Sequence, residues 1–246
     1  MRIAFLILLS SATVQAADPV WVPAMKEVHA RFAGEPGTLA LFGDSISVSL
    51  AFWAPLQGSP KNMPEDMKAA HALVKDYLKP DCWSKWRGPK FGNNGSMTIR
   101  WADENVATWL KDHNPETAVI MFGTNDLGEL KRDEYERKTA AVVDRCLKNG
   151  TVVILTTPDY HAGILKRRPD DWDGTLPKFK DIKGNEYDVP TLIARDGVHP
   201  SNPKAHQDFS DESLGKNGFA LRNYLTVMAY ADVIRQVLRA ERKKGH

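Results

Sequence analysis

The sequence predicts an α/β protein, a three-layer α/β/α sandwich built on a parallel sheet. Three short runs, at residues 38–42, 118–122 and 151–156, consist mostly of β-branched and other apolar residues and are bounded by turn residues. Runs of this length without polar alternation are typical of strands buried on both faces. Helical patterns separate the runs, and strands that alternate with helices form parallel sheets covered on both sides.

The helices are expected at residues 64–78, 97–110, 133–147 and about 218–242. In the second of these, Ile99, Val106 and Leu110 share one helical face. The third ends at Asn149-Gly150, a pair that favours the left-handed conformation with which many helices terminate, directly before a predicted strand. No repeat or low-complexity linker interrupts this pattern, so we expect a single domain.

The N-terminus has the pattern of an export signal. Arg2 supplies a positive start, residues 3–9 an apolar run, and residues 14–16 a small-residue cleavage site. The run is too short to cross a bilayer, and the alternative interpretation is a buried N-terminal strand or helix. We expect a signal peptide at 1–16 and one mature domain at 17–246, exported to the periplasm or the extracellular space. A domain of that length suits one α/β fold.

Charge gives no reason to expect nucleic acid or an anionic surface as a partner. Lys and Arg total 33, of which Arg2 leaves with the signal peptide, so 32 remain against 31 Asp and Glu. The basic residues 239–244 are expected to form the solvated end of the last helix, where cations complement the helix dipole. No later segment holds 18 uninterrupted apolar residues, so no membrane span is expected.

Two cysteines, Cys82 and Cys146, leave two interpretations open. An exported protein permits a disulfide. Cys146 lies on an apolar helical stripe, however, which favours a small buried residue at least equally. Their spacing has no metal signature, and we expect neither a metal site nor an organic cofactor.

Four short polar blocks carry the functional information. They are Gly43-Asp44-Ser45, Asn94-Gly95, residues 123–126 (Gly-Thr-Asn-Asp) and residues 196–200 (Asp-Gly-Val-His-Pro). The first and third directly follow predicted strands, and the second follows a short extended stretch expected at about residues 90–92. Ligands of a parallel sheet bind beyond the carboxyl ends of its strands. We therefore expect three of the blocks at one rim of the sheet.

These blocks contain the groups that acyl transfer requires. The hydroxyl of Ser45 becomes a good nucleophile when an imidazole accepts its proton. His199 is the candidate base, and Asp196 can orient the imidazole and stabilise its charged form. Asn125 offers side-chain amide donors, and Gly95 an unshielded backbone amide, to a developing oxyanion.

Each residue also has a structural interpretation when it is taken alone. Asp44 and Ser45 can cap a helix, and Asn125 can serve turn geometry. Residues 196–200 can form a turn with an exposed His199. The first block is not the Gly-x-Ser-x-Gly elbow of α/β hydrolases, because Ser47 stands where the second glycine belongs.

Taken in order, the four blocks resemble those of the SGNH hydrolases, also called the GDSL esterase and lipase family. The resemblance extends over residues 39–200 and implies a flavodoxin-like parallel sheet. It implies a catalytic triad of Ser45, His199 and Asp196. It also implies an oxyanion hole made by the Ser45 amide, the Gly95 amide and the Asn125 side chain.

One region departs from the family pattern. After the strand at 151–156, family members usually continue with a helix and a further parallel strand, whereas residues 157–193 are rich in proline, glycine and charge. This segment has room for a short helix near 163–168 but no strong helical period followed by a strand. We hypothesise that the chain has lost one αβ unit here, unless residues 159–164 supply the missing strand.

The same region is long enough to form a lid or a binding loop. Trp172 and Phe179 could stack on a substrate, and the equal alternative is a surface excursion whose aromatic residues pack on the body of the domain. Residues 170–174 (Asp-Asp-Trp-Asp-Gly) resemble a calcium loop only faintly, because the spaced ligands and the closing glutamate are absent.

The sequence thus predicts a serine esterase that hydrolyses small-molecule or polysaccharide esters of short acyl groups, such as O-acetyl groups. The carbohydrate preference rests on family analogy and on the abundance of tryptophan. The same groups would serve acyl transfer to a sugar, or lipid and thioester hydrolysis. The alternatives are a catalytically impaired carbohydrate-binding or scaffolding protein on the same fold, and a flavodoxin-like binding protein. The lack of a phosphate-cradling glycine-rich loop disfavours the last.

Overall fold

The computed structural model describes residues 19–156, 179–180, 186–187, 192, 194, 199–202, 204 and 206–239. The predicted signal peptide and Asp196 therefore lie outside the described residues, as does Trp172. The same is true of the candidate calcium loop at 170–174.

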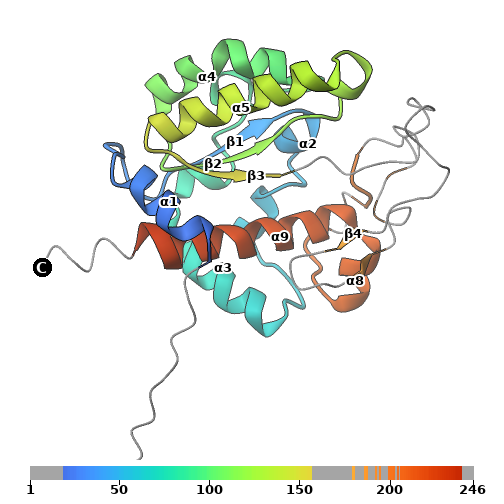
Figure 1. Cartoon of the computed structure of the whole chain (residues 1–246). Coiled ribbons are helices and arrows are strands. Elements are labelled where there is room, and N and C mark those ends of the chain that lie inside the picture. The colour runs from blue at the N-terminus through green and yellow to red at the C-terminus, as the bar shows by residue number, and fades with distance from the viewer. Residues whose placement is uncertain are drawn as a thin grey trace, which may run out of the picture.

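The centre of the domain is a three-stranded parallel sheet in the order β1-β2-β3 (Figure 1). The strands are β1 (Leu39–Gly43), β2 (Thr117–Met121) and β3 (Val152–Leu155). Every residue of β1 and β2 is buried, which is why neither run alternates with polar residues. The three predicted strands are confirmed to within two residues at each end.

Helices cover both faces of the sheet, so the three layers are confirmed. On one face, the alternate residues Ala40 and Phe42 pack with α4 (Ile99–His113) and α5 (Arg132–Lys148). On the other face, Leu39 and Leu41 pack with α3 (Glu65–Tyr77) and α9 (Gly218–Val233). Figure 1 shows these two helix layers on opposite sides of the strands.

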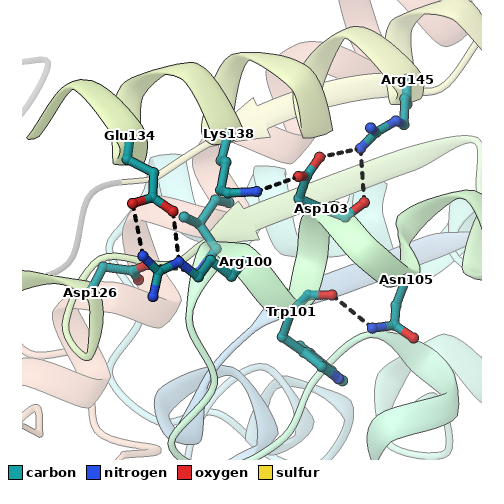
Figure 2. A network of polar contacts seen from close by, with 9 residues as sticks. Arg100, Trp101, Asp103, Asn105, Asp126, Glu134, Lys138 and Arg145 are labelled. Carbon is teal, nitrogen blue, oxygen red and sulfur yellow. Dashed lines mark hydrogen bonds and ion pairs between the residues drawn. The ribbon is translucent and has the colours of Figure 1, made fainter. Parts of the chain in front are cut away.

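Ion pairs tie α4 to α5 along the outer surface of their layer (Figure 2). Arg100 makes a bidentate pair with Glu134, through contacts of 2.6 and 2.8 Å. Asp103 accepts from Lys138 at 2.7 Å and from Arg145 at 2.6 Å, and these two cations hold the pKa of Asp103 below its ordinary value. These contacts join α4 to α5.

Several local elements differ from the sequence prediction. Helices α1 (Trp21–His29) and α8 (Asp211–Lys216) were not expected. The last helix runs from Gly218 and continues as a π-helical turn at Ile234–Leu238. The extended stretch predicted at 90–92 is wrong: Pro89–Phe91 forms a 3₁₀ helix, because proline sets a helical φ at its first residue. A single bridge from Asn93 to Gly43 then follows.

The parallel sheet of the described residues is short, as the hypothesis of a lost αβ unit requires. A separate antiparallel pair, β4 (Phe179–Lys180) and β5 (Glu186–Tyr187), does not extend it. Residues 159–164, the candidate replacement strand, lie outside the described part of the chain.

Both cysteines are buried free thiols. Cys82 belongs to the core on the α3 and α9 face of the sheet, whereas Cys146 belongs to the core beneath α4 and α5. Because the sheet separates them, the interpretation as small buried residues holds and the disulfide does not. Within the ranges that the structure describes, no helix is long and apolar enough to cross a membrane.

Candidate active site

The candidate nucleophile stands at a tight turn from strand to helix. Strand β1 ends at Gly43, and α2 (Ser45–Val48) starts two residues later. A Cβ atom on Gly43 would lie 2.0 Å from the Ser47 hydroxyl oxygen and 2.6 Å from the Met121 carbonyl oxygen, so the turn requires glycine. Asp44 caps the helix, because its Oδ1 accepts from the Ile46 amide at 3.0 Å. The predicted capping role of Asp44 is therefore present, and Ser45, the first residue of α2, is half-buried.

His199 meets Ser45 across the fold. The Ser45 Oγ lies 3.0 Å from the His199 Nε2, although 154 positions separate the two residues. The chain around His199 is anchored on both sides: its carbonyl accepts from the Ala194 amide, and the Ser201 amide donates to Leu192, each at 2.8 Å. The predicted pairing of serine and histidine in space is therefore present.

The start of α9 supports the histidine segment. A Cβ on Gly218 would lie 1.9 Å from the Leu192 carbonyl oxygen, so glycine permits this close approach. The Gly218 amide donates to the Ser201 hydroxyl at 3.0 Å, and that hydroxyl donates to the Lys216 carbonyl at 3.1 Å. The start of the C-terminal helix thereby anchors Ser201, two residues after His199.

Asn125 lies next to the nucleophile turn. Its Nδ2 donates to the Met97 carbonyl at 3.0 Å and to the Asp44 Oδ2 at 3.4 Å. Gly95 stands two residues before Met97, and a Cβ placed on it would meet nothing within 4 Å. The space beside its Cα is thus open, on a loop that Asn125 itself holds. The following residue, Ser96, has a positive φ of 56°.

Two buried carboxyls lie behind these groups. Burial raises the pKa of Asp44, against the lowering effects of the Ile46 amide, Arg222 and His199. Burial also raises the pKa of Asp126 to about 6, against the effect of the Ile99 amide, and the charge of Asp44 adds to the rise. Both shifts have the direction expected of carboxyls removed from water.

Sequence reasoning missed two residues of this region. The sequence indicated no separate role for Asp126, yet its Oδ1 accepts from the Ile99 amide at 2.7 Å and so caps α4. Arg222 projects from α9, stacks over the Phe52 ring at 4.9 Å and donates to the Thr156 hydroxyl at 3.3 Å. The sequence offered a signal, because Arg222 stands among the apolar residues of a helix. The structure leaves it only 8% exposed, where a charge needs polar neighbours.

The remaining predicted site residue, Asp196, lies outside the described residues. In the part of the chain that the structure describes, no cluster of three or more His, Cys, Asp or Glu side chains could hold a metal ion.

Comparisons with known proteins give likenesses at low identity. No protein-family model matches the sequence, and no curated protein sequence matches it. Similar solved structures include the psychrotrophic esterase EstA from Pseudoalteromonas sp., at 16% identity and a TM-score of 0.44, covering 79% of this chain and 97% of that one. They also include a family 3 carbohydrate esterase from Clostridium thermocellum, at 18% identity and a TM-score of 0.41, covering 82% and 96%. A third is a mutant of Axe2, an acetylxylan esterase from Geobacillus stearothermophilus, at 18% identity and a TM-score of 0.36, covering 83% and 95%.

Proposed function

We propose that this protein is a serine esterase that hydrolyses carboxylic esters. Ser45 attacks the ester carbonyl carbon while His199 Nε2 takes the hydroxyl proton, and a bond forms from Oγ to that carbon. His199 then gives the proton to the departing alcohol, which leaves an acyl group on Ser45. Water, activated by the same imidazole, attacks the acyl-enzyme and releases the acid.

The observation that carries this proposal is the contact of 3.0 Å between Ser45 Oγ and His199 Nε2. A nucleophile and a base within hydrogen-bonding reach are the geometric requirement for this chemistry. The two residues lie far apart in the sequence, one directly after β1 and the other before α9. Helix capping accounts for Asp44, but it gives no reason for an imidazole at this distance from Ser45.

The oxyanion would be held by donors around the same turn. The Ser45 amide stands at the start of α2, where helix amides are unpaired and the helix dipole favours negative charge. Asn125 donates one hydrogen firmly to Met97 and the other only weakly, at 3.4 Å, to Asp44. The weakly held hydrogen is the one that an oxyanion would recruit, together with the amide of Gly95.

Asp196 completes the proposal as the residue that orients His199. It stands three positions before His199 in the sequence, and the hydrogen bond from the Ala194 amide to the His199 carbonyl brings together the two ends of the segment that contains it. A carboxylate there would fix the tautomer in which Nε2 is free to accept a proton. Asp196→Asn should lower kcat on the order of 10³- to 10⁴-fold.

For the substrate, we propose an ester with a short acyl group, such as an O-acetyl group on a small molecule or a polysaccharide. We also propose that the protein is exported. The abundance of tryptophan supports a preference for carbohydrate esters less than expected from the sequence. Trp53, Trp83 and Trp109 are core residues, each at most 4% exposed, and they cannot stack on a sugar. The carbohydrate preference therefore rests on family analogy.

The test uses a fluorophosphonate probe and a series of p-nitrophenyl esters of increasing acyl length. We expect the wild type to be labelled on Ser45 and to hydrolyse the acetate, and Ser45→Ala to do neither. Ser49→Ala is the matched control, since Ser49 lies in the same segment and its hydroxyl accepts from the Ala51 amide. Absence of both labelling and turnover in the wild type would reject the esterase and favour a binding protein.

The histidine has a matched control of its own. His199→Ala should abolish labelling, because the serine then lacks its base. His113→Ala should retain it, because His113 contacts the Lys90 carbonyl at the far end of α4. Equal labelling of the two variants would remove His199 from the mechanism.

A further inference from the structure

The segment that follows Ser45 cannot hold its own shape. Helix α2 has only four residues, far fewer than an isolated helix needs to be stable. Beyond it, residues 49–53 contain no regular helix or strand. The position of the Ser45 hydroxyl and amide must therefore be imposed by contacts from other parts of the chain.

Arg87 supplies the largest set of these contacts. Its Nη1 donates to three carbonyl oxygens at the end of α2: those of Ser47 at 3.3 Å, Val48 at 2.9 Å and Ser49 at 2.8 Å. Its Nη2 donates to the Phe52 carbonyl at 2.8 Å. The last carbonyls of a helix have no partner within it, and a cation there also complements the negative end of the helix. Arg87 is thus a C-terminal cap for the helix that begins at Ser45.

In the described part of the chain, the guanidinium of Arg87 donates its hydrogen bonds to these backbone carbonyls rather than to a carboxylate. Burial lowers its pKa, and among the described residues no carboxylate pairs with it. A partly buried cation without an anion must be stabilised by oriented dipoles, and the carbonyls of residues 47–49 and 52 supply them. Arginine suits this task better than lysine, because its planar fork presents donors in several fixed directions.

The end of the segment is strained. Trp53 is fully buried and has a φ of 64°, a region that bulky residues rarely adopt. Asn223 of α9 holds it there, because its Oδ1 accepts from the Trp53 amide at 2.8 Å and its Nδ2 donates to the Ala51 carbonyl at 3.0 Å. Such strain persists only where the surroundings over-determine the backbone. Without Arg87, this segment could relax, and α2 could move with it.

We propose that Arg87 is a positioning residue for the nucleophile: by gathering the carbonyl oxygens at the end of α2, it keeps the Ser45 hydroxyl against His199 and the Ser45 amide at the oxyanion. This inference rests on the proposed esterase function. It assigns Arg87 no contact with substrate. Its effect is therefore expected on kcat and on the rate of acylation rather than on KM.

The test compares Arg87→Ala and Arg87→Lys with Arg145→Ala. Arg145 is a matched control, because it also donates to a backbone carbonyl, that of Asp103 at 2.9 Å, but in the α4 and α5 layer. We expect Arg87→Ala to lower kcat and the rate of fluorophosphonate labelling about 10- to 100-fold at nearly unchanged KM, as misplacement of a reacting group does. Arg87→Lys should be intermediate, and Arg145→Ala should match the wild type.

Chemical rescue separates positioning from a loss of folded protein. All rates are measured well below the unfolding temperature of each variant, and millimolar guanidinium should restore part of kcat in Arg87→Ala but not in Ser45→Ala. If Arg87→Ala does not fold, the same comparison with Arg87→Lys decides the question.

The inference is wrong if an active wild type keeps its kcat in the arginine variants, or if their losses appear only in KM or in the folded fraction. It is also wrong if neither lysine nor guanidinium recovers any of the lost kcat. A wild type that neither labels nor turns over would instead reject the esterase itself, and the positioning role with it.

Discussion

The Asn125 side-chain amide donates to the Met97 carbonyl at 3.0 Å. On the next residue, Asp126 accepts from the Ile99 amide at 2.7 Å. Two adjacent side chains after β2 therefore hold both ends of residues 97–99, the chain between the loop of Gly95 and helix α4. The proposed oxyanion donors Gly95 and Asn125 are consequently not independent, because the second holds the loop that carries the first.

This linkage sets the expectation for Asn125→Ala. The substitution removes a donor and loosens the Gly95 loop, so kcat should fall about 100-fold or more, with KM changed little. Steady-state kinetics on p-nitrophenyl acetate measure this. Asn105→Ala is a suitable control, since Asn105 donates to the Trp101 carbonyl on α4 at 2.8 Å and lies apart from Ser45. An Asn125→Ala variant with wild-type kcat would exclude Asn125 from the oxyanion hole.

Asp126 should make stability depend on pH in an unusual direction. Its pKa of about 6 in the folded protein lies above its ordinary value of 3.8, so the folded state binds more protons between about pH 4 and pH 6. The contribution of Asp126 to the free energy of unfolding therefore falls as pH rises through this window, by about 3 kcal/mol in total. Asp126→Asn should lack this loss.

Urea unfolding of both proteins at pH 3, 4, 5, 6 and 7 measures the difference. Asp103→Asn provides a control of opposite sign, because the pKa of Asp103 is lowered by Lys138 and Arg145. The contribution of Asp103 is present above its ordinary pKa and is lost as pH falls below it. Parallel pH profiles for wild type and Asp126→Asn would contradict the raised pKa of Asp126.

The two cysteines should be inert in the folded protein. Burial raises the pKa of Cys82 to about 11 and that of Cys146 to about 12, so almost no thiolate exists near neutral pH. We expect no reaction with a thiol reagent such as DTNB under native conditions and two reactive thiols after unfolding in denaturant. A reducing agent should leave the unfolding temperature unchanged. Fewer than two thiols after unfolding would indicate a disulfide.

Glu116 should matter for stability but not for activity. It is 1% exposed, and its carboxylate contacts His29 at 2.9 Å, the Tyr77 hydroxyl at 2.8 Å and the Gly37 amide at 2.6 Å. Its loss would leave buried partners unsatisfied, so Glu116→Ala should lower the free energy of unfolding by about 3 kcal/mol or more. Because Glu116 precedes β2, at the rim opposite Ser45, kcat of the folded variant should be unchanged.

Glu35→Ala is the matched control for that measurement. Glu35 pairs with Lys79 at the surface near Glu116, and an exposed pair of this kind contributes about 1 kcal/mol or less. Equal unfolding energies for the two variants would show that the buried contacts of Glu116 contribute little.

Most of the layer arrangement could be predicted from the sequence because its signals are local. Strands buried on both faces give unbroken apolar runs, and this placed β1, β2 and β3 to within two residues. The prediction of an extended stretch at residues 90–92 was wrong for an equally local reason. Pro89 favours a 3₁₀ turn there, so the second block reaches the rim through a single bridge at Asn93 rather than through a strand.

In the candidate site too, the residues with local sequence signals could be predicted and those without them could not. Ser45 and Asn125 were placed at one rim by strand direction alone, since parallel strands end at the same edge. Gly95 was placed there through an extended stretch that the structure does not contain. Arg87, by contrast, could not have been singled out. Its partners are backbone carbonyls about 35 to 40 positions away, and carbonyl groups carry no sequence signal.

The sequence by itself determined the order of the three sheet strands and of the four helices that cover them, and the identity of the candidate nucleophile, base and donors. These follow from residue chemistry and short-range periodicity. Only the tertiary structure decided that Ser45 and His199 lie 3.0 Å apart and that Cys82 and Cys146 stay separate. It also decided that α2 is held by Arg87. The reason is physical: contacts between distant segments depend on how whole layers pack, and local sequence fixes the layers but not the distances between their side chains.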